Sequence, residues 1–169
     1  MLDRQFSEPC AQSKLKSPSV PALWLVPNNL TSKSITKIEE YIASQLPEQF
    51  KRQFLHTRGH AREALSELWK TPALEIPLTA LPGKPPELAN DWGCVSFSHC
   101  RDALLIGWSN SKIGIDIERK DRVFSAKLIA RKYFDETEKN FLSTLSNEQY
   151  REAVLEKWIL KEAAIKWQR

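Results

Sequence analysis

The hydrophobic positions of this chain repeat with two periods, one of which predicts strands and the other helices; after residue 121 only the helical period continues. Short apolar runs and period-two alternation predict strands before residue 119. We expect these strands at residues 22–26, 73–76, 94–98, 103–108 and 113–118. Apolar residues three and four positions apart predict helices. We expect helices at residues 35–46, 48–55, 58–69, 125–134, 135–145 and from 146 to the end. The pattern therefore predicts a mixed α/β (α+β) chain.

The last expected strand, residues 113–118, carries the first candidate chemistry. Turn residues at 109–112 predict that it returns in a hairpin from the strand before it. Asp116 and Glu118 then leave one face, with Cα atoms roughly 6.6 Å apart at a rise of about 3.3 Å per residue. Two acids so close favour a cation between them, Mg²⁺ first. This stretch alone is also consistent with an edge strand whose solvent-exposed face happens to be acidic and binds no metal.

Charged residues at helical spacing give the other candidates. Glu162 and Lys166 share one face of the last helix with Trp158, although a plain helix salt bridge also explains such a pair. Arg58 and Arg62, four apart, suit a phosphate or a solvated face.

Two histidines near the start of the third expected helix are weaker candidates. His56 and His60 are also four apart, but no third ligand accompanies them, so we expect surface histidines rather than half of a metal site.

Composition restricts the class of protein. Of the 169 residues 41% are hydrophobic and 27% charged, as in ordinary globular proteins, and three cysteines without a CxxC pair make a disulfide framework unexpected. The net charge of +4 favours an anionic partner. Residues 1–20 are polar and read as a flexible leader. Without a signal sequence or a membrane span, we expect a cytoplasmic protein and no membrane partner.

Four short motifs follow one another in order. They are GKP at residues 83–85, SFSH at 96–99, GIDIE at 114–118 and WxxKEAxxK at 158–166. Together they resemble the Sfp-type 4′-phosphopantetheinyl transferases, which load carrier proteins with the arm of coenzyme A. The resemblance implies two halves related by a pseudo-two-fold, each a helix on a small antiparallel sheet. Residues 21–108 would form the first half and 109–169 the start of the second.

The same resemblance implies a metal site and a base. Asp116, Glu118 and Glu162 would hold Mg²⁺ against the pyrophosphate of coenzyme A. Glu162 would also be the general base, in line with the need to remove a proton from a serine hydroxyl.

The resemblance also implies a groove that binds coenzyme A, and it assigns further residues to that groove. Lys166 and His99 would contact phosphates of the nucleotide, and Lys84 would do likewise from the GKP loop. Ser98 would lie beside the groove. Arg62 falls in the region that binds the 3′-phosphate of coenzyme A in the related enzymes.

The implied reaction moves the 4′-phosphopantetheine arm from coenzyme A to a serine of an apo acyl or peptidyl carrier protein and releases 3′,5′-ADP. It would serve fatty acid, polyketide or nonribosomal peptide synthesis. Because the related enzymes continue with strands beyond this helix, a chain ending at Arg169 is expected to be truncated and its second half incomplete. A complete protein of this type would be a monomer.

Two other interpretations stay open. One is an inactive truncated relative that binds coenzyme A or a carrier protein without turnover. The other is a small basic nucleic-acid-binding domain, which the modest positive charge supports poorly, so we expect no nucleic-acid partner.

Overall fold

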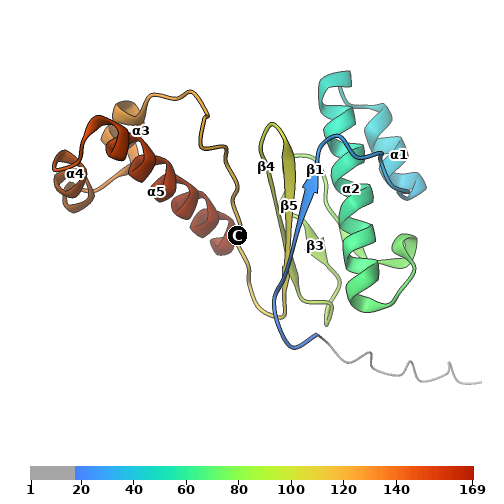
Figure 1. Ribbon diagram of the computed structural model, residues 1–169. Coiled ribbons are helices and arrows are strands. Elements are labelled where there is room, and N and C mark those ends of the chain that lie inside the picture. Colours follow the sequence, from blue (N-terminus) through green and yellow to red (C-terminus); the bar gives the residue numbers. More distant parts are fainter. Residues whose placement is uncertain (1–17) are drawn as a thin grey trace, which may run out of the picture.

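The computed structural model describes residues 18–169, and Figure 1 shows a sheet with helices on either side of it. Residues 18–109 form the sheet and the helices on one side, whereas residues 110–169 form an extended segment followed by three helices. The mixture confirms the predicted α+β class. Most of the leader expected at residues 1–20 lies outside the described residues. None of the helices within residues 18–169 has the length and apolar character needed to cross a membrane.

Three antiparallel strands form the main sheet in the order β1-β5-β4. The strands are β1 (Ala22–Pro27), β4 (Cys94–His99) and β5 (Ala103–Ser109). Alternation divides their side chains between two faces. Val26, Ile106 and Val95 lie on the face that is buried in the main core. Three of the five predicted strands are thus confirmed.

Two helices lie on that face, of which α1 (Lys37–Ser44) is short and α2 (Glu48–Trp69) has 22 residues. A capping box between Thr36 and Glu39 starts α1. The sequence predicted two helices, at residues 48–55 and 58–69, where α2 is continuous through His56 and Thr57 and also through Gly59. A Cβ at Gly59 would lie 2.5 Å from the backbone oxygen of Lys33, so glycine permits the close approach of the preceding loop. In this helix His56 is half-buried and His60 is buried, which corrects the surface positions expected for them.

The predicted strand at residues 73–76 is wrong. Ala73–Glu75 form a 3-10 turn, η1, in which Glu75 N donates to Pro72 O at 2.9 Å. The loop after it contains a small hairpin of β2 (Leu78–Thr79) and β3 (Glu87–Leu88). Between them Gly83 has φ of 74°, the left-handed conformation that a type II turn needs after a proline.

The predicted hairpin of residues 103–118 is also wrong. The strand β5 pairs with β4 and β1, and residues 112–119 run as an extended segment without a strand partner. Ile113 and Ile115 cover Gly107 of β5, where an added Cβ would lie 3.0 to 3.1 Å from their side chains. The segment therefore crosses the second face of the sheet instead of extending it. In Figure 1 it passes between the sheet and α5.

The helices of the second unit have a core of their own. They are α3 (Ala126–Tyr133), α4 (Glu136–Ser143) and α5 (Asn147–Gln168). Ala130, Phe134, Leu142 and Val154 are buried among them. The predicted capping box at Ser146 starts α5. Correspondence of these units with two pseudo-two-fold halves stays a prediction.

Candidate active site

Asp116 is the point at which three elements meet. Its Oδ1 atom accepts hydrogen bonds from Ser98 Oγ of β4 and from Lys166 Nζ of α5, each at 2.7 Å. Lys166 also donates to the backbone oxygen of Ile115 at 3.1 Å. With only 11% of the Asp116 side chain exposed, the ion pair is screened little by solvent. Residues of the SFSH, GIDIE and KEAxxK motifs are therefore in direct contact.

Ser98 holds the extended segment to the sheet. Its hydroxyl donates to Asp116, and its oxygen accepts from Ile117 N at 3.2 Å. The side chain is buried, so both hydrogen bonds form away from water. Ser98 thus positions Asp116 through its hydroxyl.

The two other predicted metal ligands do not share the partners of Asp116. Glu118 forms an ion pair with Arg122 and is only 13% exposed. Glu162 lies on α5 one turn before Lys166, half-buried. Within residues 18–169 its carboxylate has no hydrogen-bond or ion-pair partner.

Two of the three carboxylates predicted to bind magnesium are paired with cations in this structure. Nowhere in the described range 18–169 do three His, Cys, Asp or Glu side chains gather as a metal site would require. The ammonium of Lys166 and the guanidinium of Arg122 instead neutralise Asp116 and Glu118. Mg²⁺ at Asp116, Glu118 and Glu162 stays a prediction.

His99, at the end of β4, is neutral near pH 7. Burial, together with the charges of Lys166, Arg58 and His56, lowers its pKa to about 4. Thr57 donates its hydroxyl proton to Gln53 O at 2.7 Å, so Nε2 of His99 must donate to Thr57 Oγ1 at 2.6 Å. His99 is thus oriented by α2, with Nδ1 as the ring nitrogen that can accept.

Arg58 is a buried cation without a carboxylate partner. Only 8% of the residue is exposed, and burial lowers its pKa to about 10. One guanidinium nitrogen donates to Ala80 O, Nε has no partner, and the group lies 4.5 Å from the centre of the Phe54 ring. Desolvation of an unpaired charge is costly, which makes Arg58 the cation best suited to receive an anion. The sequence offered one signal for it, the spacing to Arg62.

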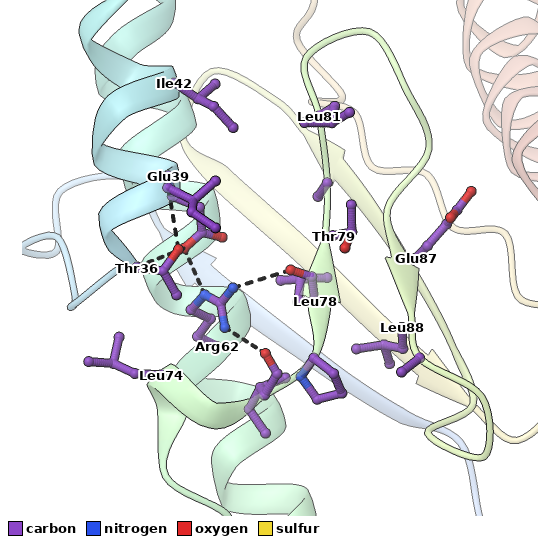
Figure 2. A pocket seen from close by; sticks show the side chains of 15 residues that line it. Thr36, Glu39, Ile42, Arg62, Leu74, Leu78, Thr79, Leu81, Glu87 and Leu88 are labelled. Carbon is purple, nitrogen blue, oxygen red and sulfur yellow. Dashed lines mark hydrogen bonds and ion pairs between the residues drawn. The ribbon is translucent and has the colours of Figure 1, made fainter.

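Arg62 is engaged elsewhere, as Figure 2 shows. Its Nε donates to Glu39 at 2.8 Å, and its other nitrogens donate to Ile76 O at 2.7 Å and Leu78 O at 3.2 Å. Burial alone would raise the pKa of Glu39, but hydrogen bonds from Arg62 and Thr36 lower it. The pair lines a pocket of about 460 Å³ between α1, α2 and the β2–β3 hairpin. Arg62 therefore has a structural explanation, and its contact with a 3′-phosphate stays a prediction.

Lys84 lies apart from these contacts. It ends the turn in which its backbone N–H donates to Leu81 O at 3.1 Å, and it is exposed. Across residues 18–169 the Lys84 ammonium binds no other group. Its predicted phosphate contact remains open.

The comparison with protein families agrees with this geometry. Residues 112–169 match the family model described as the 4′-phosphopantetheinyl transferase superfamily. This segment contains Asp116, Glu118, Glu162 and Lys166. The match confirms the predicted resemblance, in that residues 112–169 are similar to this superfamily of transferases. No curated protein matches the chain. The Sfp-type subfamily stays a prediction.

Proposed function

We propose that this protein transfers the 4′-phosphopantetheine arm of coenzyme A to a serine of an apo acyl or peptidyl carrier protein in the cytoplasm. The observation that carries the proposal is the contact of Lys166 with Asp116, which joins two motifs 50 residues apart beside an unpaired Glu162. The family match of residues 112–169 supports the same transfer.

Coenzyme A brings several phosphate charges, and we assign its phosphates to the cations around His99. Arg58 and Lys166 would donate to phosphate oxygens, because guanidinium and ammonium groups form short charge-assisted hydrogen bonds to them. A nearby phosphate would also raise the pKa of His99 and let Nδ1 donate. Lys84 would contribute from its exposed loop.

Glu162 is the proposed general base. The serine oxygen of the carrier attacks the β-phosphorus, the bond from that phosphorus to the oxygen of the departing 3′,5′-ADP breaks, and the serine proton passes to Glu162. A free, half-buried carboxylate suits this role better than Asp116, whose Oδ1 already accepts two hydrogen bonds.

The proposed transfer would require Mg²⁺, and the assay tests this requirement. Asp116, Glu118 and Glu162 have the oxygen ligands that Mg²⁺ prefers. They could bind it only after Lys166 and Arg122 release their carboxylates. The proton transfer to Glu162 is proposed without a bound Mg²⁺ ion.

The test incubates the protein with an apo carrier protein and coenzyme A, with and without Mg²⁺, and measures the carrier's mass. We expect the carrier to gain the mass of one phosphopantetheine arm, and Glu162→Gln to slow this gain by 10²-fold or more, roughly the contribution of a general base. Glu156→Gln, an exposed position of the same helix, is the control and should leave the rate unchanged. An undiminished rate in Glu162→Gln would remove Glu162 from the mechanism.

A second candidate function is coenzyme binding without turnover. The ion pairs of Asp116 with Lys166 and Glu118 with Arg122 favour it, because they occupy the carboxylates proposed for the metal. It requires that calorimetry detect coenzyme A binding while no carrier gains mass at any Mg²⁺ concentration. Labelled carrier would exclude it.

A further inference from the structure

The strand β1 lies at the edge of the main sheet and pairs with β5 on one side only. Directly after β1, Asn28 N donates to Asp102 O at 2.8 Å and continues the register of the two strands. Hydrogen-bonded pairs alternate along an antiparallel ladder, so the even-numbered residues of β1 direct their backbone groups toward β5. Leu23 and Leu25 therefore direct theirs toward the free edge.

This free edge has few backbone groups to offer, and they are unpaired. Pro21 and Pro27 also fall on it, but proline has no N–H to donate. Pro27 O already accepts from Leu30 N at 3.3 Å. Over the described residues 18–169, β5 is the only strand paired with β1, so the outward N–H and C=O of Leu23 and Leu25 have no strand partner. Such groups are a template for another strand.

The side chains along the edge are apolar and uncharged. Leu23 and Leu25 are 62% and 63% exposed, and they alternate with the buried Val26, so they lie on the second face of the sheet. Natural sheets usually protect an exposed edge with lysine or another charged side chain. The sequence from 18 to 30 has no charged residue. Nothing on this edge would therefore repel a second strand of the same sequence.

The sequence of β1 is nearly symmetric about Trp24, since residues 21–27 are PALWLVP. In an antiparallel pair of two copies centred on Trp24, Leu23 of each copy lies opposite Leu25 of the other. Each of these pairs would exchange both N–H···O=C bonds. Pro21 of one copy would lie opposite Pro27 of the other, so that no N–H is left without a partner. The strand that best complements this edge is therefore β1 itself.

We propose that this protein forms a two-fold symmetric dimer through β1, in which two three-stranded sheets join into one antiparallel sheet in the order β4-β5-β1-β1-β5-β4. The contact is isologous and closes at two copies. Because it is only one short strand long, the dimer dissociates on dilution. The pairing differs from the monomer expected for a complete protein of the family that the sequence resembles. It involves none of the proposed transferase residues and does not depend on that proposal.

Sedimentation velocity of the full chain, from micromolar to submillimolar concentration, tests the association. We expect a monomer–dimer equilibrium without larger species. Leu23→Lys and Leu25→Lys each bring a charge to the edge and should raise the dissociation constant at least tenfold. Leu160→Lys is the matched control, because Leu160 is 69% exposed on α5, away from the edge, and should leave the constant unchanged. Circular dichroism verifies that each variant is folded.

Amide hydrogen exchange tests the strand pairing residue by residue. The N–H groups of Leu23 and Leu25 should exchange rapidly in the dilute protein and slowly at concentrations where the dimer dominates. Those of Trp24 and Val26, which face β5, should be protected at both concentrations. A monomer at every concentration, larger assemblies, or equal weakening by Leu160→Lys would each overturn the proposal. Protection of Leu23 and Leu25 that does not depend on concentration would also overturn it, because another segment of the same chain would then cover the edge.

Discussion

Lys166 of α5 and Asp116 of the extended segment form an ion pair of 2.7 Å, with 26% and 11% of their side chains exposed. The pair connects the second face of the sheet to the last helix. Since Lys166 also binds the backbone oxygen of Ile115, one ammonium group fixes two consecutive residues of the segment.

Replacing this lysine should weaken the contact between α5 and the sheet. We expect Lys166→Met to lower the free energy of unfolding by about 1–3 kcal/mol, because Asp116 would keep its position with an uncompensated, mostly buried charge. Urea denaturation measures the loss. Lys120→Met is the control, because the Lys120 side chain is 90% exposed in its pair with Glu152, and such pairs contribute about 0–1 kcal/mol. Equal losses in both variants would show that burial of the pair is unimportant.

Arg58 and Arg62 should respond to substitution in opposite ways. We expect Arg58→Met to change the free energy of unfolding by less than about 1 kcal/mol, because removal of an unpaired buried charge offsets the lost contacts. Its affinity for coenzyme A should fall at least tenfold. Arg62→Met leaves Glu39 buried without its partner and should cost about 3–5 kcal/mol.

Calorimetry with coenzyme A, at a temperature where both variants are folded, compares their affinities. Arg62→Met should bind coenzyme A as the unaltered protein does. A larger loss of affinity in Arg62→Met than in Arg58→Met would restore Arg62 as the phosphate ligand and contradict the choice made from burial.

Arg58 and Arg62 also illustrate what the sequence could and could not predict. Both arginines lie on α2 at i and i+4, so their spacing is the same evidence for either. Only the folded chain brings Glu39 of α1 to Arg62 and leaves Arg58 between Phe54 and Ala80 O. Elements defined by local patterns, such as β1, β4 and the capped start of α5, were predicted well because alternation and capping are local signals.

The hairpin prediction failed because local composition does not identify which strands pair. Residues 109–112 have turn-forming composition, yet β5 pairs with β4 before it and with β1, and not with the segment that follows. The alternation of Ile115 and Ile117 suits a strand, yet Ser98 holds Ile117 N–H and takes the place of a strand partner. An alternating pattern predicts an extended backbone but does not establish that it joins a sheet.

Stability should fall as the pH is lowered from 6.5 to 4. Burial lowers the pKa of His99 to about 4, whereas the unfolded chain protonates near 6.5. Between these values the unfolded state binds more protons, so His99 contributes stability above pH 6.5 that is lost as the pH falls to 4, by at most about 3 kcal/mol. Urea unfolding across this range measures it.

The His99→Gln variant isolates this contribution. Its stability should decrease less steeply over the same interval, although His60, whose pKa is also lowered, keeps part of the slope. An unchanged slope in His99→Gln would mean that His99 protonates at its ordinary pKa in the folded protein.

Gly114 should tolerate no side chain, because α5 lies directly against it. An added Cβ would overlap the backbone oxygen of Ala163 and lie 2.5 Å from the backbone nitrogen of Trp167. Backbone atoms of a helix cannot rotate away, so Gly114→Ala must move α5 or the extended segment and separate Lys166 from Asp116. We expect a loss of unfolding free energy of about 1–3 kcal/mol, the usual range for overpacking, together with loss of transferase activity.

Gly107→Ala is the matched control for this prediction. The three atoms nearest to its Cβ would be side-chain atoms of Ile113 and Ile115, at 3.0 to 3.1 Å, and these can shift by a few tenths of an ångström. It crowds the same segment from the sheet side without touching α5. We therefore expect Gly107→Ala to retain more stability and activity than Gly114→Ala. If Gly114→Ala were the milder change, α5 would not be packed directly against the GIDIE segment.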